Sequence, residues 1–363
     1  MTHVLLVEPA YYTRYPPLGL LKLATHHRNA GHSVELTRGI ENGSKVEPDM
    51  IEVTSLFTYA WKPVHEAIKF YSDEYPRAQI RVGGIYASLM PNRIKKNFPF
   101  VEIHHGLYPE AESLMPAYDL LANVDRWEDW DASILFTSRG CIRRCPFCVV
   151  PRLEGSMRSM ITDAGKSIYP NHNRVILWDN NFLASKEWKK TLQSLIDTGL
   201  TVDFNQGLDA RLMDEEKASM LADLPMPIVR MAYDRLKDKK HIERAIELLS
   251  NSGIRKRSIL FYTLFNYYEP RKKKGDTPET FLQRVREVLE LGSNSYPMRY
   301  EPPTSLVKNK YVSPLWTASQ LEQVARARRV IGYGGAFPPY KGLITKLDQA
   351  SSFDEAFSLR SPT

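Results

Sequence analysis

Short apolar runs alternate with amphipathic segments over the first 105 or so residues. The run His3–Glu8 has the length and composition of a buried strand. Leu18–Asn29 follows with helical spacing of its apolar residues, and Gly31 stands where a helix commonly ends. The other elements expected here are strands at Ser33–Leu36, Asp49–Leu56 and Gln79–Val82 and a helix at Lys62–Glu74. Repeated βαβ units of this kind predict a parallel sheet with helices on both faces.

A second alternating series follows a stretch rich in prolines and acidic residues, Tyr108–Asp131, which we interpret as a connector. Strands are expected at Ser133–Phe136, Arg174–Trp178, Thr201–Asn205, Ile228–Ala232, Ser258–Leu264 and Ser295–Arg299. Helices are expected near Ser156–Ala164 and at Lys186–Thr198, Glu215–Ala222, Lys239–Ser252 and Pro278–Leu291. Six βα units suit an incomplete parallel barrel, in which the loops at the carboxyl ends of the strands carry the chemistry. Periodicity alone also allows an open, doubly wound sheet.

The predicted fold class is therefore α/β, with two units joined by a connector. We expect a Rossmann-like parallel sheet in residues 1–110, the connector in 111–131 and a partial (β/α)6 barrel in 132–302. Residues 303–363 form a C-terminal extension in this interpretation, with one clear helix at Ser319–Val330 and turn-rich sequence after it. A length of 363 residues suits a small domain followed by a larger one.

The composition is that of a globular protein, with 43% hydrophobic and 25% charged residues. No apolar run approaches the roughly 20 residues that a membrane span needs. The first residues, MTHVLLVEPAYY, lack the basic start, apolar stretch and cleavage site of a secretory signal. We therefore expect a cytoplasmic protein with no membrane partner.

The formal net charge of +7 favours an anionic partner such as nucleic acid. Lysines and arginines are nevertheless scattered over the whole chain, and the densest runs, Arg271–Lys274 and Arg255–Arg257, are short. The charge pattern is thus typical either of a solvated basic face or of a nucleic-acid surface, and it leaves both open.

The three cysteines of the chain, Cys141, Cys145 and Cys148, all lie within eight residues. Disulfide pairing explains this poorly, because the number is odd and no distant cysteine exists. Thiolates are the usual ligands of iron–sulfur clusters, and three of them leave one iron of a [4Fe–4S] cube open. A structural zinc site is the alternative, but zinc normally takes four ligands and no histidine stands near the run.

The C-x3-C-x2-C spacing, the aromatic Phe147 before the third cysteine and the position after a predicted strand resemble the signature of the radical S-adenosylmethionine (SAM) superfamily. The resemblance implies that Cys141, Cys145 and Cys148 hold a [4Fe–4S] cluster and that SAM chelates the open iron. Reductive cleavage of SAM would then give methionine and a 5′-deoxyadenosyl radical that abstracts hydrogen from a substrate. It also implies an external electron donor of the flavodoxin or ferredoxin type. A non-catalytic iron–sulfur protein is the alternative outside enzymology.

Further residues match places where this superfamily contacts its cofactors. Besides Phe147, Asp179 and Asn180 follow the second strand of the second series and are candidates to bind the SAM amino group, with helix capping as the alternative. After the third strand, Gln206 is a candidate for the ribose or methionyl groups and Arg211 for the methionyl carboxylate, with a turn and a structural salt bridge as the alternative. Arg230 is a weaker candidate at the end of the fourth strand.

The N-terminal unit is similar to the cobalamin-binding-type domain that precedes many radical SAM barrels. The similar runs are Pro16–Leu20, Gly31–Val34 and Val82–Ala87. The cobalt-ligating motif Asp-x-His-x-x-Gly is absent, because neither His104 nor His105 has an aspartate two positions before it. We therefore expect the fold without a cobalt-ligating base, and cobalamin as a less expected cofactor.

The number of cysteines excludes reaction classes that need more than one cluster. Methylthio-transfer and many peptide-maturing enzymes need additional clusters, and this chain has no cysteines for them. We expect hydrogen abstraction from a small molecule or peptide. The two alternatives are modification of a nucleobase in DNA or RNA and a cobalamin-dependent methyl transfer. The nucleobase alternative relies on a basic, aromatic tail formed by Arg326, Arg328, Arg329, Tyr333, Tyr340 and Lys341.

Overall fold

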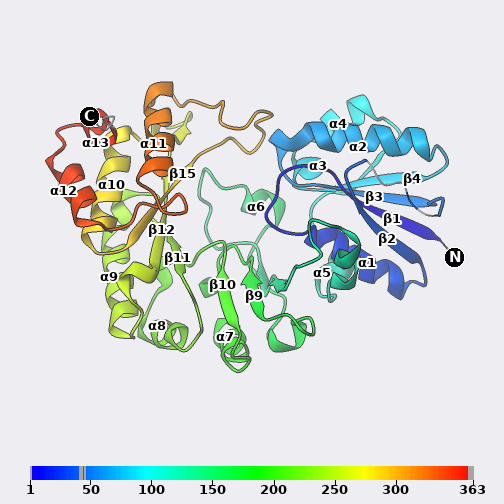
Figure 1. Cartoon of the computed structure of the whole chain (residues 1–363), viewed down its shortest axis with the longest axis horizontal. Helices are drawn as coiled ribbons and strands as arrows, with labels where there is room; N and C mark the ends of the chain where they lie inside the picture. Colours follow the sequence, from blue (N-terminus) through cyan, green and yellow to red (C-terminus); the bar gives the residue numbers. More distant parts are fainter. Residues whose placement is uncertain (1, 41–43, 45, 359–363) are drawn as a thin grey trace.

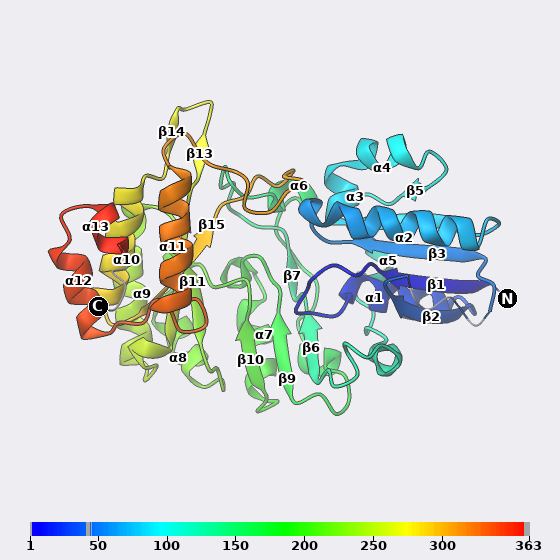
Figure 2. The ribbon, with the colours of Figure 1, turned by 45° about the horizontal axis from the view of Figure 1, so that its top comes forward.

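The computed structural model describes residues 2–40, 44 and 46–358, which form two α/β units side by side (Figure 1). The N-terminal unit, blue to cyan, holds one five-stranded sheet, and the second unit holds six longer parallel strands and the helices around them. Figure 2 shows β9 and β10 lying between the N-terminal sheet and the C-terminal helices.

The N-terminal sheet is entirely parallel, with its strands in the order β2-β1-β3-β4-β5. Its strands are β1 His3–Glu8, β2 Ser33–Arg38, β3 Met50–Ser55, β4 Gln79–Gly84 and β5 Glu102–Ile103. Its helices are α1 Leu18–Asn29, α2 Trp61–Glu74, α3 Ile85–Leu89, α4 Pro91–Asn97 and α5 Pro109–Glu112. The strands and helices expected from periodicity are thus present, with ends that shift by one or two residues.

Both faces of this sheet are covered, as the unbroken apolar run of β1 predicts. Leu5 and Val7 pack with α2 in one core, whereas Val4 and Leu6 pack with α1 in the other. The second core also contains the segment expected as a connector, whose Tyr118–Asn123 forms a short 3-10 helix. The connector therefore lies against the sheet as a packed layer.

The second unit holds two three-stranded parallel sheets, in the orders β10-β9-β6 and β11-β12-β15. An isolated parallel bridge between Leu208 and Met231 lies between them. The strands are β6 Ala132–Leu135, β9 Arg174–Leu177, β10 Thr201–Phe204, β11 Val229–Ala232, β12 Ile259–Phe265 and β15 Asn294–Arg299. Short two-stranded pairs are formed by β7 Ser138–Arg139 with β8 Arg158–Ser159 and by β13 Tyr268–Glu269 with β14 Lys274–Gly275.

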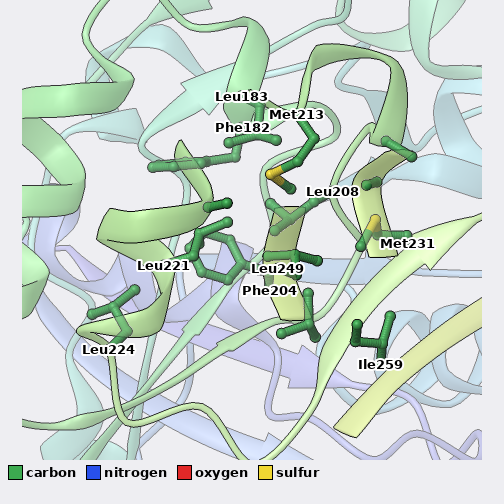
Figure 3. Packing of buried hydrophobic residues seen from close by; sticks show 14 of the residues in the cluster. Phe182, Leu183, Phe204, Leu208, Met213, Leu221, Leu224, Met231, Leu249 and Ile259 are labelled. Carbon is green, nitrogen blue, oxygen red and sulfur yellow. The ribbon is translucent and has the colours of Figure 1, made fainter. Parts of the chain in front are cut away.

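Between and after these strands lie the helices of the second unit and of the C-terminal extension. They are α6 Val150–Leu153, α7 Trp188–Ile196, α8 Glu215–Ala222, α9 Lys239–Asn251, α10 Pro278–Glu290, α11 Ala318–Val330, α12 Lys341–Gln349 and α13 Phe353–Phe357. One buried apolar cluster joins the strands to α7, α8 and α9, with Phe182, Phe204 and Met231 among its members (Figure 3). The buried residues of α7, α8 and α9 recur at helical spacing, so each of these three helices turns one apolar face into this cluster.

The C-terminal extension packs as a further layer on α10. Phe281 of α10 lies in one apolar cluster with Trp316, Phe337, Phe353 and residues of α11 and α12. The turn after α11 also pairs with the second unit, because the backbone N–H groups of Ser295 and Phe337 each donate to the carbonyl of the other. Sequence periodicity found α11 but missed α12 and α13, which are short.

The prediction of a helix near Ser156–Ala164 is wrong. The chain there turns at Gly155, which has a φ of +75°, and then forms β8 antiparallel to β7. The backbone N–H groups of Met160 and Ile161 both donate to the Thr137 carbonyl. This segment is therefore part of a two-stranded ribbon formed by β7 and β8. The helix that follows the cysteines is the single turn α6.

No helix among the described residues is long and apolar enough to cross a membrane.

Candidate functional site

The carboxyl ends of the strands of both units meet at one cleft. In a parallel sheet the loops after the strands share one edge, and ligands bind there. The cleft has a volume of about 580 Å³. Its N-terminal wall comes from the loops after β1, β3, β4 and β5, and its other wall from those after β6, β9 and β10. The second wall contains Phe136, Arg139, Leu153, Glu154, Trp178, Asn180, Asn205 and Gln206.

The cysteine loop begins directly after β6 and β7, and Gly140 fixes its entry. Gly140 has a φ of +75°, and a Cβ atom there would lie 2.3 Å from the Ser156 carbonyl oxygen. Only glycine fits this close approach without moving the backbone. The chain therefore passes from β7 into Cys141 by a turn that the neighbouring ribbon restricts.

Arg139 ties the start of this loop to both units. Its guanidinium donates to Glu112 Oε2 at 2.7 Å and to Glu154 Oε1 at 3.0 Å, and it stacks over the Phe136 ring. Glu154 Oε2 in turn accepts from the Gly140 backbone N–H and from Asn180 Nδ2. Because these charged side chains are all largely buried, they hold the loop entry in one arrangement.

Asp179 anchors the other side of the loop entry. Its carboxylate, which is 3% exposed, accepts hydrogen bonds from the backbone N–H and the hydroxyl of both Thr137 and Ser138. Burial raises the pKa of Asp179, and these four hydrogen bonds oppose that shift. The structure thus directs Asp179 into the protein, where it joins the end of β9 to the residues before the cysteines.

Polar groups surround the sulfur of Cys141. The backbone N–H of Arg143 and the amide of Asn181 donate to Cys141 Sγ at 3.3 and 3.5 Å. Asn181 Nδ2 also donates to Asp209, which forms ion pairs with Arg143 and Arg211. Burial would raise the pKa of Asp209, but the hydrogen bonds and charges of Arg211 and Arg143 outweigh it and hold that pKa low. Asp209 is therefore an anion that fixes the donors around this thiol.

The three cysteines suit a cluster ligand set. All three are free thiols that line one hollow of about 1040 Å³. Burial raises the pKa of the Cys145 and Cys148 thiols. In the described part of the chain, no three Cys, His, Asp or Glu side chains are gathered as around a single metal ion. A [4Fe–4S] cube takes one thiolate per iron, so its cysteines need not converge on one point.

The structure brings some of the other sequence candidates to the cleft. Asn180 and Gln206 line it, and Gln206 is exposed. The guanidinium of Arg211 instead makes two hydrogen bonds to Asp209, which is the structural salt bridge left open above. Arg230 pairs with Asp203 of the neighbouring strand. Phe147 packs edge to face on Tyr267, at 5.5 Å between ring centres.

Sequence reasoning missed two residues of this region. Asn181 contacts Cys141 directly, although only its neighbours Asp179 and Asn180 were singled out. Asp234 follows β11, and burial raises its pKa to about 6. The signal for Asn181 was present, because strand residues alternate in direction and the loop after β9 carries polar side chains at three successive positions.

The N-terminal wall of the cleft does not fit a histidine-ligated cobalamin. Its described lining residues include no histidine, and His104 points into a separate hollow of about 180 Å³ beside β4. His104 Nε2 also lies 3.1 Å from the Leu107 carbonyl oxygen. A cobalamin held in the cleft would therefore have no histidine ligand from the described residues.

Some arginines of the basic, aromatic C-terminal segment make contacts within the protein. Arg328 stacks on Tyr296 and donates to the Gly335 carbonyl, and Arg329 pairs with Glu322. Tyr333 and Tyr340 are exposed. Two of the arginines assigned to a nucleic-acid surface thus also have structural partners.

No protein-family model matches the chain. Among curated proteins, it is 24% identical over 279 residues to a tRNA-2-methylthio-N(6)-dimethylallyladenosine synthase of Sulfurihydrogenibium sp. (strain YO3AOP1). The match covers 62% of this chain and 61% of the relative, so the chain spans about three fifths of the length of that protein.

Among solved structures, the chain is similar to TsrM from Kitasatospora setae, a radical SAM methyltransferase determined with tryptophan and the SAM analogue aza-SAM. The TM-score is 0.62, over 91% of this chain and 77% of that one, at 16% identity. The likeness shows a shared fold of parallel α/β units. Together with the sequence relative, it agrees with the superfamily indicated by the cysteine motif.

Proposed function

From the premise that this is a radical SAM protein by motif, relative and fold, we propose that it cleaves SAM reductively and abstracts hydrogen from a substrate held in the cleft. The observation that carries this proposal is the convergence of two features. Three free thiols in the superfamily spacing line one hollow. The residues that flank their loop, Arg139 before it and Leu153 and Glu154 after it, form part of a wall of the cleft between the two units.

In this proposal Cys141, Cys145 and Cys148 hold the [4Fe–4S] cluster. When bound, the cluster and SAM supply a 5′-deoxyadenosyl radical, and the protein supplies binding, orientation and protection from side reactions. Asn181 and the Arg143 backbone N–H donate to the sulfur of Cys141, which lowers electron density on a cluster ligand.

Asn180 and Gln206 are the proposed SAM contacts, because their amides line the cleft next to the cysteine loop. Asp179 acts through the backbone by fixing residues 137 and 138, and Arg211 acts by holding Asp209. Both are thus positioning residues in this proposal. Arg230 belongs with them, since its guanidinium is committed to Asp203.

The substrate is proposed to lie against the aromatic part of the cleft. Tyr12, Tyr15, Phe57, Tyr59, Phe136 and Trp178 line it together with the cations Arg14 and Lys308. Flat rings offer large contact area with little loss of conformational freedom, and the cations favour an anionic group. A small molecule or peptide with a planar part and a carboxylate or phosphate fits this lining.

The order of the strands supports the division into units proposed from the sequence. The 2-1-3-4-5 order of the first sheet is that of a doubly wound Rossmann-like domain, and residues 1–110 would be a cobalamin-binding-type fold without a cobalt-ligating histidine. Residues 132–302 would be the partial (β/α)6 barrel, in which the Leu208–Met231 bridge continues one three-stranded sheet into the next.

The test is SAM cleavage under strictly anaerobic conditions. Reconstituted protein with SAM and dithionite is expected to form 5′-deoxyadenosine, and Cys145→Ala is expected to form none. Lys256→Ala, an exposed change in the turn before β12, is the control and should behave as wild type. A reconstituted cluster that never cleaves SAM would contradict the proposal and favour a passive iron–sulfur protein.

Nucleobase modification is the second candidate, and the relative named for a tRNA modification favours it. Transfer RNA added to the reconstituted enzyme should then accelerate 5′-deoxyadenosine formation at least about tenfold. Arg326→Ala, which removes an exposed arginine of α11, should weaken RNA binding and reduce its salt dependence. No effect of RNA on either quantity would remove this candidate.

A further inference from the structure

A separate hollow of about 180 Å³ lies in the N-terminal unit beside the carboxyl ends of β3 and β4. None of the three cysteines is among its described lining residues. Its volume is below the roughly 300–1,000 Å³ of sites that take drug-sized ligands, so only a small molecule fits. Its apolar wall is formed by Leu20, Leu23, Val53, Leu107, Tyr108 and Ala111.

The side chain of Lys22 brings a positive charge into the wall of this hollow. Lys22 of α1 is only 6% exposed, and its Nζ donates to the backbone carbonyl oxygen of Glu112. Burial lowers the pKa of Lys22 to about 8, and the charge of Arg139 adds to this shift, whereas Glu112 opposes it. A buried ammonium group is costly unless an anion pairs with it, so an anion placed in the hollow is strongly favoured.

The two carboxylates that line the hollow already have arginine partners. Glu52 accepts a hydrogen bond from Arg81 Nε at 3.0 Å, and Glu112 accepts one from Arg139 Nε at 2.7 Å. Among the lysines, arginines and acidic residues described in this lining, Lys22 alone lacks an oppositely charged side chain within ion-pair distance. The protein therefore leaves the charge of Lys22 for a ligand to neutralise.

We propose that this hollow, which we call the Lys22 pocket, binds a small monocarboxylate with an apolar body, whose carboxylate pairs with the Lys22 ammonium group. A single unpaired cation in a largely apolar wall suits one negative charge better than two. The apolar wall removes the body of the ligand from water, which adds to the affinity. The inference does not depend on the proposed SAM cleavage, because binding in this pocket needs no cluster.

The first test compares charged and neutral ligands of nearly equal shape. Phenylacetate and isovalerate, each beside its amide, are titrated by calorimetry into the full-length reconstituted protein. At least one carboxylate is expected to bind wild type about tenfold or more tightly than its amide, because only the carboxylate forms a charge-assisted hydrogen bond with Lys22.

Lys22→Met tests the role of the charge. Methionine has a side chain of similar length without the ammonium group, so the carboxylate and its amide should bind this variant within about twofold of each other. Lys62→Met is the matched control, since Lys62 is an exposed lysine of α2 outside the pocket, and it should keep the preference. The preference is a ratio of two affinities, so a partly unfolded sample does not imitate its loss.

Gly19→Leu tests the place of binding. Gly19 lines the pocket as the second residue of α1, and a Cβ atom there would meet no heavy atom within 4 Å. The leucine should therefore enter the pocket and weaken carboxylate binding about tenfold or more, without lowering the unfolding temperature, because leucine favours a helix more than glycine does. Gly342→Leu makes the same change at the second residue of α12, also in open space, and should leave binding unchanged.

Any of three results would overturn the inference. They are wild-type protein that binds neither carboxylate more tightly than its amide, a Lys22→Met variant that keeps the full preference, and a Gly19→Leu variant that binds as tightly as wild type. Loss of the preference in Lys22→Met together with unchanged binding in Gly19→Leu would place the carboxylate outside the pocket and so would also count against it.

Discussion

At the scale of single residues, the cysteine loop depends on side chains that lie just before it and far from it in sequence. Arg139 joins Glu112 of the N-terminal unit to Glu154 after the cysteines. Removing one partner of a buried ion pair leaves the other charge without compensation, which is far more costly than losing an exposed pair. Arg139, two positions before Cys141, therefore holds the entry of the loop between these two carboxylates.

Arg139→Met should destabilise the protein by about 3 kcal/mol, because Glu112 and Glu154 would stay buried without their cation. Urea unfolding of the cluster-free protein measures this loss. Arg28→Met breaks the exposed pair with Asp119 and should cost less than about 1 kcal/mol. Equal losses in the two variants would show that the Arg139 network does not stabilise the fold.

Gly140→Ala should reduce the iron bound after reconstitution by at least about half, because its Cβ would meet the Ser156 carbonyl. Gly199→Ala is the matched control, since Gly199 also has a positive φ but open space around its Cβ position. The control should lose only about 1 kcal/mol of stability and keep its iron. Full iron content in Gly140→Ala would disprove the restricted turn.

The sequence indicated the cysteines but not the residues that orient them. The three cysteines lie within eight residues, so their spacing alone predicts a metal-cluster ligand set without a structure. The contact of Asn181 with Cys141 and the pairing of Arg211 with Asp209 depend on side-chain directions at strand ends. A polar run such as residues 205–211 indicates that a site is near. It does not indicate which of its side chains face the cleft and which form ion pairs within the protein.

At the scale of elements, long periodic segments were predictable and short ones were not. α1, α9 and α10 have enough turns to show an apolar stripe, and they occur within a residue of the expected ends. Residues 156–164 have apolar spacing that suggests two turns of helix, but Arg158 and Ser159 within them form β8 and pair with β7. Its conformation is decided by tertiary hydrogen bonds to Thr137, which no local pattern reports.

The end of β1 carries a titratable group that should make stability depend on pH. Glu8 is 1% exposed, and burial raises its pKa from 4.5 to about 7, although Trp127 Nε1 and Arg38 favour its ionised form. The folded state therefore binds this proton more tightly than the unfolded state. The stability that Glu8 contributes is greatest below about pH 4.5 and falls as the pH rises to about 7.

Glu8→Gln should remove this dependence. Between pH 5 and pH 8, the free energy of unfolding of wild type should fall by on the order of 2 kcal/mol more than that of the variant. Urea unfolding at both pH values measures the difference. Parallel pH profiles for the two proteins would contradict a protonated Glu8 at low pH.

At the scale of the whole molecule, the two α/β units meet with the carboxyl ends of their strands toward a common cleft. The loop after β15 also reaches the N-terminal unit, where Thr58 Oγ1 lies within hydrogen-bonding distance of the Pro303 and Ser305 carbonyls. The order of strands and helices could be predicted from the sequence. The way in which the two units face each other could not, because it depends on contacts between residues 245 or more positions apart.

Thr58→Val should loosen the loop after β15 without unfolding either unit. Loss of the hydroxyl leaves two carbonyls without this donor, which is worth about 1 kcal/mol. Amide hydrogen exchange in residues 301–311 should become several times faster, while exchange in β1 and β12 stays as in wild type. Unchanged exchange in residues 301–311 would show that this contact does not hold the loop to the N-terminal unit.

The most direct measurement of the central claim is the electron paramagnetic resonance spectrum of the reduced, anaerobically reconstituted protein with and without SAM. Three cysteine ligands and one open iron predict about four irons and four sulfides per chain and a reduced-cluster signal that shifts when SAM binds. The Cys145→Ala variant should show no such signal. Stoichiometric zinc in place of iron, or a cluster signal that SAM leaves unchanged, would contradict the account.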